Sequence, residues 1–167
     1  MKLQCLSNHF KVKRITEESC LEVLQLCEGN PMYYQYCPPK PTKISICEDL
    51  KKLPPKKTLK DKFYIGFYEE EKLVAVMDLI LAYPNEETIF IGFFMVEKAF
   101  QKKGIGSFII KEVLSYLSQE YTFVRLGYVQ NNQQSESFWL KNHFHPTGVV
   151  VKEENYSIVV LERKLEE

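Results

Sequence analysis

A glycine-containing turn is the part of the sequence whose residue types and spacing most directly indicate chemistry. The stretch from Gln101 to Ser107 reads Gln-Lys-Lys-Gly-Ile-Gly-Ser and follows an apolar run at 93–96. Two glycines separated by one residue allow a sharp turn and leave several backbone N–H groups exposed at the start of a following helix. Such groups, with the partial positive charge of the helix end, bind anions without an arginine. Such a turn suits a diphosphate, and the rest of the sequence must indicate which anion binds.

Hydrophobic periodicity predicts the elements that position the turn. Apolar residues at period two predict a hairpin with strands at 63–68 and 73–81, and a third strand at 88–96 leads into the turn. Apolar residues at helical spacing then predict a helix over 105–117. The remaining predicted elements are a strand at 122–129, a helix at 132–142 and strands at 144–151 and 156–161.

The first 60 residues have a less regular pattern. A weak alternation predicts a strand within 3–13, and a helix is expected from Thr16, whose hydroxyl is a good cap, to Gly29. Prolines separate short helical segments near 31–36 and 44–53.

Residues 30–60 are rich in loops and aromatic side chains. Long connections are often functional, so this region is either a lid or wall for a substrate or a layer in which Tyr33, Tyr34 and Tyr36 seal the core. The sequence leaves both interpretations open.

Composition restricts the class of protein. The 167 residues, 45% of them hydrophobic, suffice for one domain with a substantial core, so we expect a single domain over 1–167. Lys+Arg and Asp+Glu both number 22, which gives no bulk electrostatic reason to expect nucleic acid or a membrane surface as partner. The chain lacks an apolar run long enough for a membrane span and a signal-peptide core, and we expect a cytoplasmic protein.

Cysteine and histidine residues do not suggest a metal centre. The five cysteines have no Cys-x-x-Cys spacing, and we expect them to be reduced thiols: Cys5, Cys20, Cys27, Cys37 and Cys47. His143 and His145 are separated by one residue and lack the further ligands that a metal site needs.

Neighbouring residues exclude two common folds that use a glycine turn. A dinucleotide-binding fingerprint requires a third glycine where this chain has Ile109, and a Walker A loop requires Gly-Lys-Ser/Thr where it has Gly106-Ser107. A nucleotide-binding fold is therefore the weakest of our hypotheses.

Two motifs resemble the GNAT superfamily of acyl-CoA-dependent N-acyltransferases. The family motif Val-x-x-x-x-Arg/Gln-x-x-Gly-x-Gly/Ala is matched by Val96, Gln101, Gly104 and Gly106. The family motif Asn-x-x-Ala-x-x-x-Tyr-x-x-x-Gly-Phe corresponds to Asn132, Ser135, Trp139, His143 and Phe144. The specific resemblance extends over about 61–144. It implies an α/β (α+β) fold with a mixed, mostly antiparallel, twisted sheet of six or seven strands, about four flanking helices, and strands splayed at a cofactor cleft.

The resemblance also implies acetyl-CoA as co-substrate and a set of residues that bind it. Backbone groups of 94–96 are expected to pair with the pantetheine arm and polarise the thioester carbonyl. Amides of 102–107 are expected to bind the pyrophosphate, and Lys102 and Lys103 either steer the anion or are only exposed charges. The expected cofactor-binding residues are Phe94, Met95, Val96, Gln101, Lys102, Lys103, Gly104, Ile105, Gly106, Ser107, Asn132, Ser135, Phe138, Trp139 and Lys141.

The sequence departs from the family pattern where a proton donor is expected. Trp139 occupies the position of the tyrosine that protonates the departing thiolate, and an indole N–H does not ionise near neutral pH. The acid is therefore unassigned, and CoA, whose thiol has a pKa of about 8.5, can leave as thiolate or take a proton from water. His143 replaces the family's glycine, and we do not assign it a catalytic role because it closes a helix away from the splayed strands.

Asp78 is the most informative candidate for a general base. It stands in an otherwise apolar strand, where a carboxylate is costly unless it has a partner or a task. Either it accepts a proton from the incoming amine, or it hydrogen-bonds a backbone end or lies at the sheet edge. Glu86 and Glu87 are alternative bases, and Tyr83 is a candidate to assist.

The main hypothesis is an enzyme that transfers acetyl from acetyl-CoA to a primary amine of a small molecule or peptide, directly and within a ternary complex. No cysteine lies in the cofactor motif, which argues against an acylated cysteine. The alternative is a non-catalytic CoA-binding or interaction module on the same fold, for which Trp139 is the best support. We expect no metal, no nucleic acid or membrane partner, and a monomer or homodimer.

Overall fold

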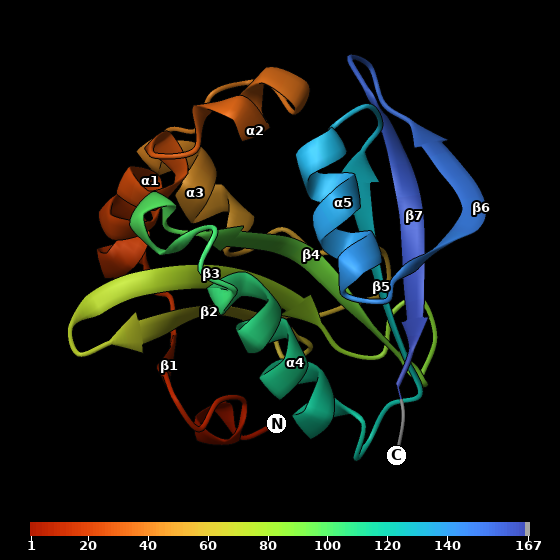
Figure 1. Ribbon diagram of the computed structural model, residues 1–167, viewed down its shortest axis with the longest axis horizontal. Helices are drawn as coiled ribbons and strands as arrows, with labels where there is room; N and C mark the ends of the chain where they lie inside the picture. The colour runs from red at the N-terminus through yellow and green to blue at the C-terminus, as the bar shows by residue number, and fades with distance from the viewer. Residues whose placement is uncertain (166–167) are drawn as a thin grey trace.

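The computed structural model describes residues 1–165, in which seven strands form one mixed sheet (Figure 1). The strand order is β1-β2-β3-β4-β5-β7-β6, and each neighbouring pair is antiparallel except β4 and β5. The prediction of a mixed, mostly antiparallel sheet of six or seven strands is confirmed. The strands are β1 (Lys11–Arg14), β2 (Lys62–Glu69), β3 (Lys72–Ile80), β4 (Thr88–Val96), β5 (Phe123–Val129), β6 (His145–Lys152) and β7 (Ser157–Lys164).

The parallel pair in this sheet is short, and this produces the splay between its strands. Residues 88–91 of β4 pair with residues 123–126 of β5, whereas the rest of β5 pairs only with β7. Figure 1 shows β4 and β5 diverging from their shared end, with α5 (Gln133–Lys141) lying over β5. The predicted splay at the end of the 88–96 strand is therefore present.

Helices cover both faces of the sheet. A larger buried cluster packs α4 (Ile105–Leu117) and α5 against one face, and a smaller cluster packs α1 (Cys20–Glu28) and α3 (Lys43–Asp49) against the other. The short α2 (Pro31–Tyr36) lies beside α1 and α3 and contributes partly buried tyrosines to the smaller cluster. The described residues form five α-helices, one more than the four expected.

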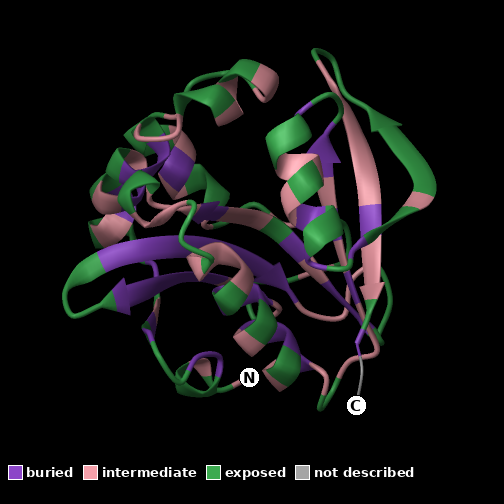
Figure 2. Cartoon of the chain, viewed as in Figure 1, coloured by how far each residue is buried: buried purple, intermediate pink, exposed green. Residues whose placement is uncertain are grey.

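From Ala75 to Leu79, alternation along β3 assigns its residues to one or the other of these faces, since successive side chains of a strand point in opposite directions. Ala75, Met77 and Leu79 belong to the larger cluster, whereas Val76 belongs to the smaller one. Asp78 has the parity of Val76 and therefore faces α1 and α3. Because helices cover both faces, β3 is buried almost throughout, as Figure 2 shows.

The predicted strand within 3–13 is only partly correct. Leu3–Cys5 form a 3-10 turn, and β1 comprises four residues. The reason lies in Ser7, whose Oγ accepts hydrogen bonds from the amides of His9 and Phe10 at 3.1 and 2.9 Å. A side chain that bonds nearby amides holds the backbone in a turn and competes with a strand ladder.

The predicted helix from Thr16 begins later than expected. Residues 17–19 form a 3-10 turn, in which the Ser19 amide donates to the Thr16 carbonyl, and the Thr16 hydroxyl makes no capping bond. The helix ends before Gly29 as predicted. In contrast, α3 has a reciprocal cap in which Thr42 and Ser45 bond each other's backbone.

None of the helices formed by the described residues is long and apolar enough to span a bilayer.

Candidate functional site

The glycine turn adopts the conformation that the spacing predicts. Gly104 has φ of 78° and caps the start of α4, and Lys102 also has a positive φ, of 58°. A Cβ built on Gly104 would meet no atom within 4 Å, so glycine is favoured here by backbone conformation and not by space. The turn leads the backbone of 102–104 directly into the first residues of α4.

Six successive amides in this turn have no acceptor in the fold. Within residues 1–165 none of the N–H groups of 102–107 donates a hydrogen bond, whereas the Phe108 amide donates to the Gly104 carbonyl at 2.9 Å. Unpaired amides at a helix N-terminus are ready to bind an anion. The residues present therefore fit the predicted pyrophosphate site.

Gly106 is required for a different reason, which is close packing. A Cβ at this position would lie 3.1 Å from a ring carbon of Phe138 and 3.4 Å from the Val96 side chain. The missing side chain lets the first turn of α4 approach both β4 and α5. Gly106 thus places the unpaired amides beside the splayed edge of β4.

The Gln101 side chain fixes the chain between β4 and the turn. Its Nε2 donates to the Val96 carbonyl at 2.8 Å and also to Oδ1 of Asn30. Asn30 in turn donates to the carbonyls of Val96 and Leu26 at 3.2 and 3.0 Å. The structure thus gives the Gln101 side chain a positioning role, and it adds Asn30, which the sequence did not suggest because the two are 71 positions apart.

The ladder between β3 and β4 determines which backbone groups of 94–96 are free. The Glu97 amide donates to the Val74 carbonyl at 2.8 Å, and hydrogen-bonded pairs alternate along an antiparallel ladder. Met95 therefore bonds Val76, and the polar groups of Phe94 and Val96 point away from β3. Gln101 and Asn30 already donate to the Val96 carbonyl. The backbone groups that remain to pair with the pantetheine arm are therefore the N–H and carbonyl of Phe94 and the N–H of Val96.

Polar contacts hold α5 against the start of α4. Asn132 is buried and caps α5, with Oδ1 accepting from the Ser135 amide at 3.1 Å. At the other end of α5, Asn142 Nδ2 donates to the Ser107 hydroxyl at 3.1 Å. Ser107 therefore joins the two helices, and its amide remains among the unpaired set.

Trp139 lies in the hydrophobic core and is only 6% exposed. Its ring contacts those of Phe138, Phe144 and Phe94 at centroid distances of 4.9, 5.2 and 6.0 Å. The indole thus supports the strand that carries the Phe94 backbone.

Of the other residues expected near the cofactor, Ser135 is half-buried, and three lysines are exposed: Lys102, Lys103 and Lys141.

His143 is exposed and has a φ of 63°. This is the left-handed region in which glycine is the least strained residue. The backbone here thus explains on physical grounds why a glycine suits the position.

Asp78 is 9% exposed and forms an ion pair with Lys62, which is 3% exposed. The Lys62 Nζ donates to Asp78 Oδ2 at 2.6 Å, and within the described residues Oδ1 is buried without a hydrogen-bond partner. Burial raises the pKa of the Asp78 carboxyl, and the Lys62 ammonium opposes that effect. Gly92 makes room for the carboxylate, since a Cβ there would lie 2.8 Å from Oδ2.

The predicted base and its predicted helper line the same cavity, which has a volume of about 630 Å³. Asp78 and Tyr83 both lie in its wall, together with Tyr33 and Tyr34 of α2. Glu86 and Glu87 are exposed in the turn before β4 and do not line it. Residues 30–60 therefore supply a wall of the cavity, and Tyr33 and Tyr34 also pack against the smaller core cluster, so both interpretations that the sequence left open hold in part.

Asp49 at the end of α3 also lines the cavity, and sequence analysis missed it. Its side chain is exposed at the mouth, but the walls restrict its solvation and raise the pKa of its carboxyl. Among the described residues, no three His, Cys, Asp or Glu side chains gather in a way that could hold a metal ion.

The fold and the unpaired amides at the start of α4 agree with the resemblance to the GNAT superfamily that the two sequence motifs indicate. The family model described as Acetyltransferase (GNAT) family matches residues 27–144. The chain belongs to the GNAT acetyltransferase family.

Solved structures with the same fold have low sequence identity to this chain. An acetyltransferase from Thermus thermophilus has a TM-score of 0.73 and 16% identity, with 93% of this chain and 97% of that chain covered. An acetyltransferase from Salmonella typhimurium that modifies the N-terminal serine of ribosomal protein L7/L12 has a TM-score of 0.73, 12% identity and coverages of 96% and 98%. A ribosomal L7/L12 alpha-N-protein acetyltransferase in complex with coenzyme A has a TM-score of 0.68, 12% identity and 96% coverage of both chains. No curated protein sequence matches the chain.

Proposed function

We propose that the protein transfers an acetyl group from acetyl-CoA to a primary amine of a small molecule or peptide, directly and within a ternary complex. The observation that carries this proposal is the arrangement around the free edge of β4. Unpaired amides of 102–107 lie at the end of this edge on the α4 side, and the cavity with Asp78 opens on the opposite face of the sheet. Two substrates can thus reach one strand from two sides.

On the cofactor side, the chain contributes backbone groups. The amides of 102–107 bind the pyrophosphate, and Gly106 brings them against β4. The free polar groups of Phe94 and the Val96 N–H pair with the pantetheine arm and polarise the thioester carbonyl. Backbone donors fixed by a sheet stabilise developing negative charge because they need no reorganisation during the reaction.

On the acceptor side, Asp78 removes a proton from the amine. The ammonium gives one proton to the carboxylate, the neutral nitrogen bonds to the carbonyl carbon, and the carbon–sulfur bond breaks. The second proton passes from nitrogen to water as the amide forms, and the thiolate departs or takes a proton from water. Lys62 positions Asp78, and Tyr83 lies in the same wall.

One observation favours the non-catalytic alternative. Trp139 is packed among three aromatic rings and provides no proton to the leaving thiolate. A protein that retains the cleft without turnover would bind acetyl-CoA and release no CoA.

Assays of binding and turnover separate the two functions. Stabilisation by acetyl-CoA is measured first by thermal shift, with ATP as the control ligand, and CoA release is then followed with a panel of amines. Acetyl-CoA binding together with amine-dependent CoA release supports the enzyme. Binding that persists with no release from any amine supports the module.

A further inference from the structure

The cavity on the acceptor side has the size and lining of a small-molecule site. Its volume of about 630 Å³ is within the range of about 300–1,000 Å³ typical of ligand pockets. Its wall combines aromatic rings from β2, β4, α2 and the turn before β4 with the prolines of the loop after α2. The aromatic residues in the wall are Tyr33, Tyr34, Tyr64, Tyr83, Phe90 and Phe93.

Three of these rings form a continuous layer. Phe93 contacts Tyr33 edge-on at a centroid distance of 5.7 Å and stacks with Tyr64 at 6.5 Å. Burial raises the pKa of the Tyr33 and Tyr64 hydroxyls, which keeps both phenols neutral. A neutral aromatic layer binds apolar or aromatic groups, and its ring faces also attract a cation.

One buried carboxylate lies in this wall. Of the acidic and basic side chains that line the cavity, Asp78 alone is buried, whereas Asp49, Glu153, Lys40 and Lys52 are exposed at the mouth. With one hydrogen bond from Lys62 and one unpartnered oxygen, Asp78 has fewer partners than a buried carboxylate normally requires. The cavity wall therefore contains one buried carboxylate, whose Oδ2 is shared with Lys62, and the mouth, with both signs of charge, offers no preference for a second positive charge.

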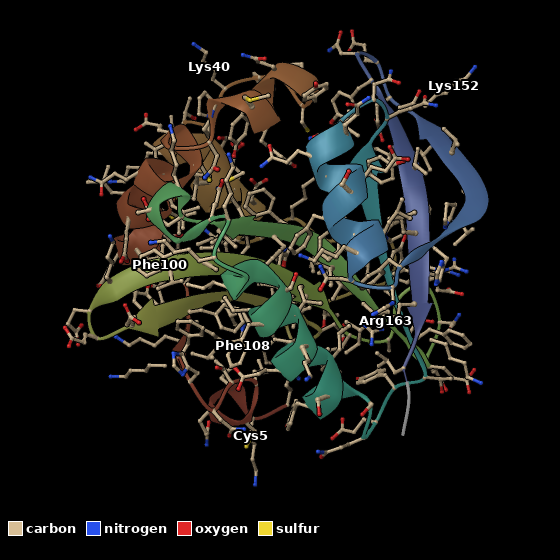
Figure 3. The ribbon with its side chains drawn as sticks, in the orientation of Figure 1. Cys5, Lys40, Phe100, Phe108, Lys152 and Arg163 are labelled. Carbon is tan, nitrogen blue, oxygen red and sulfur yellow. The ribbon has the colours of Figure 1, made fainter. Side chains whose placement is uncertain are left out.

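The turn between β6 and β7 borders the cavity, since Glu153 of this turn is in its lining. Burial raises the pKa of the Tyr33 and Tyr156 hydroxyls, and Cys37, which also lines the cavity, adds to the shift of both. In Figure 3, Lys40 of the loop after α2 and Lys152 at the end of β6 lie on the two sides of this region. The acceptor is thus bounded by two segments that are far apart in the sequence.

We infer that the acceptor is a small amine with a single positive charge and an aromatic or apolar body. This inference rests on the proposed acetyl transfer. The ammonium group binds at Asp78, and the body of the amine packs on the layer formed by Tyr33, Tyr64 and Phe93. Tyr33 is a specificity-determining residue, since it belongs to the 30–60 connection that walls the cavity and not to the sheet.

The first experiment compares four acceptors with saturating acetyl-CoA and measures kcat/KM from CoA release. The acceptors are phenethylamine, butylamine, spermidine and an alanine tripeptide with a free amino terminus. We expect phenethylamine to exceed spermidine and the tripeptide by about tenfold or more, as one good aromatic contact allows. Equal or greater kcat/KM for spermidine or the tripeptide contradicts the inference while leaving the proposed acetyl transfer intact.

A pair of variants on α2 tests the aromatic layer. Tyr33→Leu removes a ring from the layer, whereas Tyr36→Leu changes a tyrosine on the same helix that does not line the cavity. For Tyr33→Leu we expect the KM for phenethylamine to rise about five- to tenfold while the KM for butylamine stays within about twofold. Tyr36→Leu should leave both KM values unchanged.

Other results of these experiments would contradict either the specificity role of Tyr33 or the proposed function. An equal rise in both KM values for Tyr33→Leu contradicts a specificity role, and Phe93→Leu repeats the comparison if Tyr33→Leu fails to show thermal stabilisation by acetyl-CoA. No acetylation of any amine, with acetyl-CoA bound, contradicts the proposed function itself.

Discussion

Asp78 and Lys62 form a buried pair in which each residue depends on the other. Both side chains are almost fully covered, and the bond between them is 2.6 Å long. Removing two charges from water is costly, so such a pair is weak evidence of stabilisation by itself. The unpartnered Oδ1 and the position in the cavity wall are the observations on which the proposed role in proton transfer rests.

Asp78→Asn tests this role through the pH–rate profile. A base acts when deprotonated, so activity of the wild type should fall as pH drops through the pKa of Asp78, which burial raises above its ordinary value. We expect the variant to lose about 10²-fold or more in kcat and to lose this acidic limb, with the Kd of acetyl-CoA changed by less than about threefold. A variant that keeps the wild-type profile would exclude Asp78 as the base.

Lys62→Met tests the dependence of Asp78 on its partner. The variant leaves a buried carboxylate unpaired, so we expect a loss of about 3–5 kcal/mol in the free energy of unfolding at pH 7. The folded-state pKa of Asp78 then lies further above its unfolded value, so the loss is greatest above the folded pKa and shrinks as pH falls below it. Denaturant unfolding at two pH values measures this.

The control for Lys62→Met is the double variant with Asp78→Asn, which removes the unpaired charge. It should recover a large part of the lost stability. A double variant that is as unstable as the sum of the single variants would show that packing, and not charge, explains the loss.

Cys37 is the cysteine that lines the acceptor cavity, and no cysteine lies in the cofactor turn. Direct transfer requires no thiol nucleophile, so we expect Cys37→Ser to retain kcat within about threefold. Rapid mixing with acetyl-CoA, followed by mass measurement of the intact protein, should show no acetylated enzyme. A burst of acetylated protein that disappears in Cys37→Ser would replace direct transfer with a two-step mechanism.

At the scale of elements, two glycines at the start of α4 perform different tasks. Gly104 provides a left-handed backbone with open space around it, whereas Gly106 provides close contact with Phe138 and Val96. The Gly-x-Gly spacing therefore meets two different requirements, one for backbone conformation at its first glycine and one for close packing at its second.

Gly106→Ala should separate these requirements. Its Cβ would meet a ring carbon of Phe138 at 3.1 Å, so we expect α4 to shift away from β4, with a loss of about 1–3 kcal/mol in stability and at least about tenfold weaker acetyl-CoA binding. Gly104→Asn is the matched control, because asparagine tolerates a positive φ and meets no neighbour. Calorimetric titration with acetyl-CoA should show a much smaller effect for the control, and equal losses for both variants would contradict the packing role.

Local patterns explain which elements could be predicted from the sequence. The hairpin of β2 and β3, β4, the glycine turn and α4 follow from periodicity and turn residues that lie within a few positions of each other. The start of α1 and the limits of β1 were wrong because Ser7 and Thr16 form local turns whose geometry the spacing does not reveal.

Contacts between distant segments explain what was missed. Asn30 bonds Gln101 across 71 positions, and Asp49 joins the cavity only because α3 packs beside β2 and β3. Lys62 was the one missed residue with a usable signal. It lies one residue before the strand predicted at 63–68, and in the observed hairpin of β2 and β3 it is diagonal to Asp78, two positions from Tyr64, the direct partner of Asp78, and on the same face of the sheet.

At the scale of the whole molecule, the sheet separates two sites that meet at one strand. Residues expected to bind the cofactor gather on the side of α4 and α5, whereas the aromatic cavity lies on the side of α1, α2 and α3. The splay between β4 and β5 exposes the backbone edge that both sides share. The short parallel pair within the sheet of the described residues is thus the feature on which the proposed direct transfer depends.

The most direct test of this account is the identification of both products in one reaction. The protein is incubated with acetyl-CoA and phenethylamine or another accepted amine, and mass spectrometry measures the acetylated amine while a thiol reagent measures free CoA. We predict equal amounts of the two products, formed only when both substrates are present, and no acetyl group on the protein. Tight binding of acetyl-CoA with neither acetylated amine nor free CoA, from any amine tested, would contradict the account.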